Sequence, residues 1–335
     1  MTDVTRRGLG RLAAGSGLAM GMLGLPLPRG AAAQGSFPDH PIRLIVTTPP
    51  GGNVNGIARI IAEQFGRAAG QPMIVDNRPG AGGTIAEQVV LRSPPDGYTV
   101  LFSTLGALVT NAFTYPQSAN NARDFTAIGM ATGTPLLLMS HVSLPVRDVP
   151  ELVAYARQHP DEVTFATSGI GTLPHLFAER FSRSAGVRML HVPYQGGSAQ
   201  LTDVLAGRTK IVFESQFNGI PMIQSGNVRG LAITAERRTT QLPEVPTMAE
   251  SGFPDLTYTF WTGMAVSSAV PEPVQSRLSE LLNQALRAPE TAQALGVFGV
   301  EPMAAVSAAE FRALLERERA AWRPIAEPIA ASMRG

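Results

Sequence analysis

The chain has 335 residues, of which 44% are hydrophobic and 16% are charged, with no cysteine and a formal net charge of +1. This is the composition of a globular protein, and the length is sufficient for two modest domains. The lack of cysteine excludes disulfides, a thiolate nucleophile and sulfur ligands for a metal, and a near-neutral chain with one lysine offers no basic patch for nucleic acid.

The first 33 residues are typical of an export signal. Arg6 and Arg7 precede a weakly apolar stretch, 9–27, and three alanines at 31–33 supply small residues for cleavage near Ala33. The arginine pair indicates the twin-arginine route, and we expect the mature protein in the periplasm. A retained membrane helix is the alternative, but glycine and proline interrupt this run. Without residues 1–33 the chain carries 23 basic and 25 acidic side chains, a net charge of −2.

The turn 49–55 lies between an apolar β-branched run, 42–46, and a run of helical period that starts at Gly56. This pattern predicts a strand, a sharp turn and a helix with Asn53 as its N-cap. Gly51 and Gly52 let the backbone approach a ligand closely. Because unpaired amides and the helix dipole favour an anion at a helix N-terminus, the turn is predicted to form half of a carboxylate-binding site.

Strands and helices then alternate along the chain, which predicts a mostly parallel sheet with helices on both faces. In the first unit we expect strands at 73–77, 98–102, 127–130 and 136–140, and a helix at 84–92. A second alternating unit follows, with helices expected at 149–158, 173–184 and 199–206 and strands at 163–167, 189–192, 210–213 and 228–234. A strand at 258–266 is expected to return to the first unit, followed by helices at 272–286 and 310–322.

Several chemistries are excluded or weakly supported. No glycine-rich turn is followed by the lysine of a P-loop, the dinucleotide fingerprint lacks its third glycine, and the nucleophile elbow of α/β-hydrolases is absent. The five histidines lack the paired spacing of a zinc site, although His175 and Glu179 lie four residues apart on one predicted helix. We therefore expect no metal, no cofactor and no enzymatic activity.

What remains is a set of turns built from small residues, each following a predicted strand. In open α/β sheets ligands bind beyond the carboxyl ends of the strands, and hydroxyls and free amides from two units suit a small carboxylate. The alternative is that the glycines only permit tight turns. The turns are Gly51-Gly52-Asn53, Gly82-Gly83, Ser103-Thr104, Ser168-Gly169 with Thr172, and Gly196-Gly197-Ser198.

These motifs together resemble the receptors of tripartite tricarboxylate transporters, also called the Bug family of extracytoplasmic solute-binding proteins. The resemblance covers essentially all of the chain after residue 33, in the family's order. The matching runs include Pro41–Val46 with Pro49–Gly52, Asp76–Gly83, Pro95–Thr99, Gly169–Thr172 with His175-Leu176, His191–Tyr194, Leu242–Thr247 and Trp261–Gly263.

The resemblance implies a type II periplasmic-binding-protein fold with two lobes joined by crossing strands and a ligand cleft between them. Lobe 1 is then residues 34–137 plus 259–335, and lobe 2 is residues 138–258. It also implies a carboxylate ligand and a two-component membrane permease as partner, and we expect a monomer. The ligand-binding residues carried over by the resemblance are Gly51, Gly52, Asn53, Asn55, Ser103, Thr104, Ser168, Gly169, Thr172, His175, Tyr194 and Glu214.

Three positions depart from the family's pattern. Asn55 stands where an aspartate is common, Gln195 where a lysine is often found, and Glu214 where the usual acid is an aspartate. A neutral amide can donate to a ligand oxygen, whereas a carboxylate would repel an anion or recruit a cation. The charge of the pocket is therefore retuned, and the sequence leaves the identity of the acid open.

We therefore expect a periplasmic receptor that closes on a small organic acid and delivers it to a tripartite permease. A second hypothesis is a receptor that reports its ligand to a membrane sensor. A third is a carboxylate-processing hydrolase or isomerase that uses His175 with Ser168 or Glu214.

Overall fold

Two mixed sheets organise the protein, seen in a computed structural model that describes residues 37–115, 124–303 and 306–332. These residues belong to one compact unit, Ser36–Gly335. The first sheet has the strand order β11 (Glu301–Pro302), β4 (Phe125–Thr134), β10 (Phe260–Ser267), β3 (Thr99–Thr104), β1 (Ile42–Val46) and β2 (Met73–Asn77). The second has the order β7 (Leu190–Pro193), β6 (Thr164–Thr167), β8 (Ile211–Ser215), β5 (Leu136–His141) and β9 (Val228–Ile233). The expected export signal lies outside the described residues.

The prediction of a mostly parallel sheet is wrong. In the first sheet β10 is inserted between β3 and β4 and runs antiparallel to both, while β1 is parallel to β2 and β3. In the second, β5 runs antiparallel to both β8 and β9, while β6 is parallel to β7 and β8. The two strands that follow a crossing from the other sheet, β5 and β10, are therefore antiparallel to both of their neighbours. This long-range pairing is not specified by the local sequence pattern.

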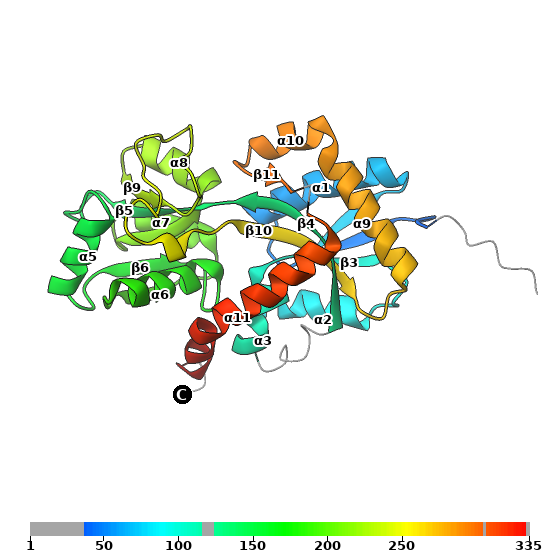
Figure 1. Ribbon diagram of the computed structural model, residues 1–335, viewed down its shortest axis with the longest axis horizontal. Helices are drawn as coiled ribbons and strands as arrows, with labels where there is room; N and C mark the ends of the chain where they lie inside the picture. The colour runs from blue at the N-terminus through cyan, green and yellow to red at the C-terminus, as the bar shows by residue number, and fades with distance from the viewer. Residues whose placement is uncertain (1–36, 116–123, 304–305, 333–335) are drawn as a thin grey trace, which may run out of the picture. The chain divides into compact units, whose positions relative to one another are not determined.

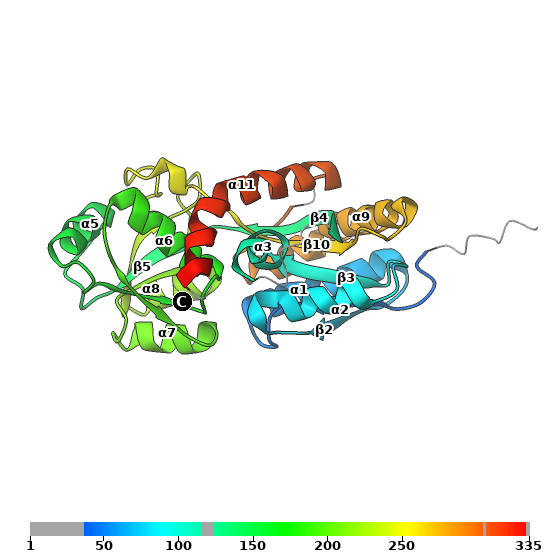
Figure 2. The ribbon, with the colours of Figure 1, turned by 90° about the horizontal axis from the view of Figure 1, so that it is seen from below.

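Both faces of each sheet are covered by helices, which explains why the strands are apolar runs. Leu44 and Val46 pack with α1 (Asn53–Ala69) and α9 (Glu272–Arg287), whereas Ile45 points to the core that includes α2 (Thr84–Arg92). In the second sheet Leu138 packs with α5 (Val149–Gln158) and α6 (Leu173–Ala185). Leu137 faces α7 (Gly197–Leu205) and α8 (Gln216–Gln224), and the two pairs of helices are seen on opposite sides in Figure 2.

The two chain crossings between the sheets are bonded to each other at Thr234. β4 runs into β5 with Pro135 alone between them, and the chain returns from β9 to β10 through 234–259 (Figure 1). Thr234 Oγ1 accepts the Leu136 N–H at 2.9 Å and donates to the Tyr258 carbonyl at 2.7 Å. The Thr234 N–H in turn donates to the Leu136 carbonyl at 2.9 Å. This one side chain thus holds the two crossings in register.

The last helix, α11 (Ala308–Ser332), packs against elements of both sheets (Figure 1). Phe311 contacts Trp261 of β10 with ring centroids 5.2 Å apart, and Trp322 contacts Phe177 of α6 at 5.4 Å. The sequence predicted an end near Trp322, but the helix continues through Pro324 and Pro328 because its buried apolar face continues. No helix within the described ranges is long and apolar enough to cross a bilayer.

Some short elements had no sequence prediction. They are α3 (Asn111–Thr114), α8, α10 (Pro289–Gly296), β11, the turns of 3₁₀-helix at Ala81–Gly83 and Pro254–Leu256, and the π-helical turn η2 (Gly106–Thr110). None of them is longer than nine residues, and their local patterns carried no signal that the sequence analysis recognised.

Candidate functional site

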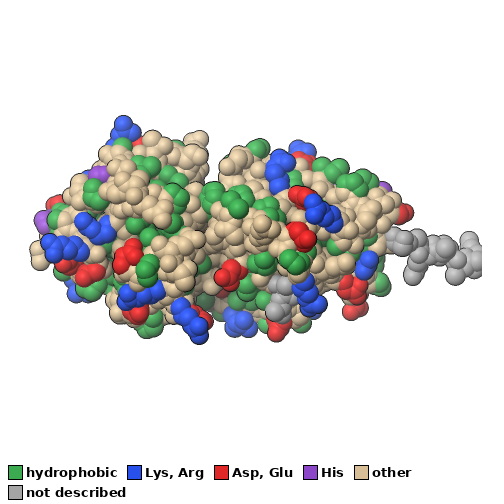
Figure 3. Space-filling view, turned by 90° about the horizontal axis from the view of Figure 1, so that it is seen from above, with side chains coloured by type: hydrophobic (Ala, Val, Ile, Leu, Met, Phe, Trp, Pro, Cys, Tyr) green, Lys and Arg blue, Asp and Glu red, His purple; other side chains and the backbone are tan. Residues whose placement is uncertain are grey.

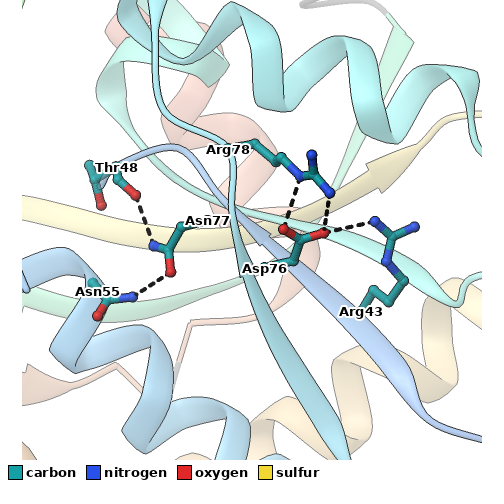
Figure 4. Close-up of polar contacts among 6 residues, drawn as sticks. All are labelled: Arg43, Thr48, Asn55, Asp76, Asn77 and Arg78. Carbon is teal, nitrogen blue, oxygen red and sulfur yellow. Dashed lines mark hydrogen bonds and ion pairs between the residues drawn. The ribbon is translucent and has the colours of Figure 1, made fainter. Parts of the chain in front are cut away.

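The turn between β1 and α1 is held from behind by two amide side chains (Figure 4). Asn77, the last residue of β2, donates through Nδ2 to the Thr48 carbonyl at 2.8 Å and accepts from Asn55 Nδ2 at 2.9 Å. Asn55 Oδ1 accepts from the Gly51 N–H and from Arg59 Nε, both at 3.3 Å. Asn55, which the sequence placed among the ligand contacts, is buried and has both its polar atoms engaged within the protein.

The prediction that Asn53 caps α1 is wrong. The N-cap is Gly52, with φ −83° and ψ 167°, and no side chain accepts a hydrogen bond from the first turn. Asn53 is the first helical residue, and its Nδ2 lies 3.4 Å from Ser215 Oγ at the end of β8. Gly51, with φ +85°, is in a conformation that favours glycine. The first turn of α1 therefore presents its N–H groups without a side-chain cap.

A charged cluster next to this turn fixes the end of β2 (Figure 4). Asp76 accepts from Arg78 Nε and Nη2 at 2.9 and 3.1 Å and from Arg43 Nη2 at 2.8 Å. Burial by itself would raise the pKa of Asp76, but the hydrogen bonds and charges of Arg78 and Arg43 bring that pKa below its usual value. The Arg78 N–H also donates to the Val46 carbonyl at 2.8 Å. The backbone hydrogen bonds between β1 and β2 therefore continue one residue past the end of β2.

The other two turns of the first sheet are linked to each other. Asn111 Nδ2 donates to the Gly82 carbonyl at 3.0 Å and to Glu87 Oε1 at 2.8 Å, which connects the turn after β2 to the one after β3. Ser103 is fully buried, and its hydroxyl donates to the Thr104 carbonyl at 3.2 Å. Thr104, which ends β3, is half-buried. Of these two predicted contacts, Thr104 is the more exposed residue.

In the second sheet the turns after β6 and β7 are bonded together. The Gly196 N–H donates to the Ser168 carbonyl at 3.2 Å, and the Tyr194 N–H to the Thr167 carbonyl at 2.9 Å. The Tyr194 hydroxyl donates to Asp203 Oδ2 of α7 at 2.8 Å. The hydroxyl of this predicted ligand contact is therefore engaged within the protein. The two turns form one continuous rim at the carboxyl ends of β6 and β7.

The rim leads directly into the first turn of α6. Thr172 is the N-cap of this helix, but its hydroxyl donates to the Gly169 carbonyl at 2.7 Å and caps no helical N–H. Gly169 has φ +143°, within the range where glycine is favoured. Ser168 and Thr172 are both half-buried. The first turn of α6 therefore also lacks a side-chain cap, as the first turn of α1 does.

Behind this rim two imidazoles are stacked, an arrangement that the sequence did not predict. His175 Nδ1 accepts the Gly171 N–H at 3.0 Å, and its ring stacks on His191 with centroids 3.9 Å apart and an interplanar angle of 11°. His191 Nε2 lies 2.6 Å from Thr167 Oγ1, within hydrogen-bond distance. Burial, and then the charge of His191, lower the pKa of His175 to about 3, and burial lowers that of His191 to about 4. The neutral pair supports the rim from inside the lobe.

Glu214 lies at the end of β8, next to the start of α8. Its Oε1 accepts from the Ser215 N–H at 2.8 Å, from the Ser215 hydroxyl at 3.0 Å and from Asn218 Nδ2 at 3.2 Å. Burial raises the pKa of Glu214, and these hydrogen bonds act against that rise. Because Ser215 also meets Asn53, this carboxyl belongs to a chain of contacts between the two sheets. The sequence missed Ser215, whose one signal was its place two residues after the predicted strand 210–213.

The five turns carry no basic side chain of their own, and one of them carries the Glu214 carboxyl. Helices α1, α6, α7 and α8 all begin without a side-chain cap, and the turns at 48–55, 103–106, 168–175, 193–198 and 214–218 contain no lysine or arginine. Helix N-termini of this kind attract anions without a positively charged side chain. On the face shown in Figure 3, basic and acidic side chains are interspersed over the surface.

The sequence indicated His175 and Glu179 as two weak candidates for metal ligands, and the described residues include no third ligand beside them. His175 Nε2 lies 3.9 Å from Glu179 Oε1. No group of three or more histidine, aspartate or glutamate side chains in the described ranges is placed to hold a metal ion. The pair is therefore an isolated contact within α6.

Comparison with known proteins finds similar sequences and similar folds. The sequence profile of the tripartite tricarboxylate transporter family receptor matches residues 57–330. A Pseudomonas sp. (strain P51) protein encoded in the tcbD–tcbE intergenic region is 36% identical over 301 residues, 89% of this chain and 88% of that protein. Rhodopseudomonas palustris Rpa4515 with adipate superposes with a TM-score of 0.79 at 31% identity, covering 88% and 98% of the two chains. MatC from the same organism, with bound malate, gives 0.78 at 26% identity, covering 87% and 100%.

Proposed function

The chain belongs to the family of tripartite tricarboxylate transporter receptors, and from this premise we propose that it captures a small carboxylate between two lobes and delivers it to a two-component membrane permease. The family consists of periplasmic solute-binding proteins, and its solved members include complexes with adipate and malate. We propose that this chain acts in the periplasm as a monomer, exported by the twin-arginine route, and that it is a receptor and not an enzyme.

The observation that carries this proposal is the set of uncapped helix N-termini at the carboxyl ends of strands in both sheets. A carboxylate placed there would accept N–H groups from α1 on one side and from α6 and α7 on the other. Thr104 and Ser168 add hydroxyls at the same ends, and Thr172 uses its hydroxyl to hold the Gly169 carbonyl. The backbone supplies the anion site, and the side chains Asn55 and His175 position that backbone.

We propose residues 34–137 with 259–335 as the first lobe and 138–258 as the second. The sheet membership of the strands supports this division to within two residues, because β5, which begins at Leu136, belongs to the second sheet. Rotation about the two crossings, which Thr234 joins, would bring the lobes together around the ligand. The ligand contacts in lobe 1 are proposed to be Gly51, Gly52, Asn53 and Thr104, with Asn55 and Ser103 behind them; those in lobe 2 are Ser168, Gly169 and Thr172, with Tyr194, His175 and Glu214 behind them.

The arrangement of His175 supports a receptor over an enzyme. The hydrolase hypothesis needs an imidazole nitrogen that can accept a proton from a nucleophile such as Ser168. His175 Nδ1 already accepts the Gly171 N–H, and burial lowers the pKa of this histidine to about 3. A base with so low a pKa is a poor proton acceptor near neutral pH.

The proposal is tested by thermal unfolding of residues 34–335 with a panel of organic acids. Ligand at about 100 times its dissociation constant adds about 2.7 kcal/mol to the free energy of unfolding, which raises the midpoint by several degrees. The control for each acid is its neutral amide, which has the same skeleton and no carboxylate. A shift with an acid and not with its amide supports the proposal. No shift with any acid, for folded and ligand-free protein, would contradict it.

A further inference from the structure

The last helix, α11, connects the two proposed lobes in addition to the two chain crossings. In the first lobe, Arg319 Nη2 donates to the Leu108 carbonyl of η2 at 3.1 Å. In the second lobe, the Trp322 ring contacts the Phe177 ring of α6, with centroids 5.4 Å apart. The buried face of α11 belongs to a single apolar cluster that includes strands of both sheets. α11 is therefore a third connection between the lobes.

Two prolines stand inside α11 near its end. Pro324 and Pro328 are four residues apart in a helix that runs to Ser332. A proline has no N–H to donate within a helix, and its ring clashes with the preceding turn, so helices bend at such positions. The ribbon of α11 changes direction in its C-terminal part, and its end lies beside α3 and α6 (Figures 1 and 2). We call residues 324–332 the strap.

The prolines also provide a backbone acceptor for the second lobe. In a regular helix the carbonyl of residue 324 accepts the N–H of residue 328, which Pro328 lacks. Arg183 Nη1 of α6 donates to this Pro324 carbonyl at 2.7 Å. The guanidinium of Arg323, one residue earlier, lies over the Phe113 ring of α3, 5.3 Å from its centroid. The start of the strap is thus tied to α6 in one lobe and to α3 in the other.

The two lobes contact each other in this conformation. A Cβ on Gly171, in the turn before α6, would lie 3.7 Å from Thr114 Cγ2 of α3. Asn53 Nδ2 of α1 lies 3.4 Å from Ser215 Oγ at the end of β8. A rotation that opens the cleft moves α3 away from α6, because these helices belong to different lobes. The strap, which is tied to both, then has to give up one of its two ties.

We propose that the strap holds a fraction of the molecules closed before any ligand binds. A carboxylate then selects molecules that are already closed. The apparent dissociation constant is the intrinsic constant divided by the closed fraction, so the strap raises the affinity for every acid alike without contacting any of them. This role rests on the proposed two-lobed receptor, and it does not depend on which acid is bound.

Opening is measured as the distance between two spin labels in ligand-free protein, residues 34–335. The chain has no cysteine, so Gln224→Cys in α8 and Gln293→Cys in α10 place one label on each lobe at exposed positions. Double electron–electron resonance resolves closed and open molecules as a short and a long distance. We expect the short distance to be populated in the native chain without any acid.

The first variant removes the tie to the second lobe. Arg183→Met deletes the donor to the Pro324 carbonyl at an exposed position, and the ratio of closed to open molecules should fall by about three- to tenfold. The matched control is Arg157→Met. Arg157 Nη2 donates to the Ala185 carbonyl at the same distance, 2.7 Å, but both residues lie in the second lobe. The control should leave the ratio unchanged.

The second variant separates holding the lobes from stabilising the fold. Pro324→Ala with Pro328→Ala restores both helical N–H groups, so the Pro324 carbonyl position is satisfied within α11 and no longer needs Arg183. Alanine also favours the helix, so denaturant unfolding should show an equal or higher free energy of unfolding. The ratio of closed to open molecules should nevertheless fall by about three- to tenfold. A role in stability alone would leave that ratio unchanged.

Three results would overturn the strap. The first is a native chain that shows only the long distance, and the second is an unchanged ratio in either variant. The third is an equal fall of the ratio in Arg157→Met. Because the distances are measured without acid, each of these results leaves the carboxylate receptor standing. A panel in which no acid shifts the unfolding midpoint contradicts the receptor instead, and it leaves the measured distances unaffected.

Discussion

The stacked pair His175 and His191 should make the protein lose stability in mild acid. In the unfolded chain each imidazole takes up a proton as the pH falls through its ordinary pKa of 6.5. In the folded protein, burial lowers the pKa to about 3 for His175 and to about 4 for His191. The stability that the neutral pair contributes is therefore present above pH 6.5 and is lost as the pH falls toward these values, because only the unfolded state binds the protons.

The expected size follows from the shifts. Each proton bound only by the unfolded state lowers the free energy of unfolding by about 1.4 kcal/mol per pH unit, so between pH 7 and pH 5 each histidine costs about 2 kcal/mol and the pair about 4. Glu179 and Glu214, whose pKa values are raised by burial, act in the opposite direction and stabilise the fold as the pH falls. A comparison with a variant that keeps both acids removes their contribution.

The double variant His175→Asn with His191→Gln keeps an acceptor near Nδ1 for Gly171 and an amide near Nε2 for Thr167, and it cannot titrate. Denaturant unfolding at pH 7, 6 and 5 should show the native chain losing about 4 kcal/mol more than the variant. His159→Gln, which removes a histidine whose side chain is 39% exposed, is the control. Parallel pH profiles for the native chain and the double variant, or an equal effect of the control, would refute the reasoning.

Three further predictions concern the site and its surroundings. Thr172→Val removes the hydroxyl that donates to the Gly169 carbonyl at 2.7 Å, and carboxylate binding measured by calorimetry should weaken by about 1–3 kcal/mol; unchanged affinity would mean that the turn does not contact the ligand. Asn77→Leu removes the hydrogen-bond partner of the Thr48 carbonyl, at 2.8 Å, and of Asn55 Nδ2, at 2.9 Å, so denaturant unfolding should show that the free energy of unfolding falls by about 1–3 kcal/mol. A change near zero would show that these two hydrogen bonds do not stabilise the turn. A Cβ at Gly56 would lie 2.4 Å from the Phe298 ring, so Gly56→Ala should cost about 1–3 kcal/mol in the native chain but become neutral or stabilising when Phe298 is alanine. Additive effects in that double-mutant cycle would contradict the contact.

The positions of most strands and helices could be predicted from local pattern. The helices at 149–158 and 272–286 were expected within one residue of their observed ends, because their apolar periodicity and flanking prolines act over a single turn. The small-residue make-up of the turns was also readable, since glycines and small hydroxyl residues after a strand are a local feature. The motifs further indicated the family, which the sequence profile confirms.

The pairing of strands and the roles of individual side chains were decided only by the tertiary structure. The insertion of β10 between β3 and β4 joins residues more than 120 positions apart, and no local pattern specifies it. Asn55 was expected to face the ligand, yet Asn77 and Gly51 engage its amide, because β1 and β2 end side by side. The sequence by itself thus determined which turns follow strands and are built from small residues. The fold decided which side chains support those turns from behind, since a hydrogen bond between distant residues depends on where the strands bring them together.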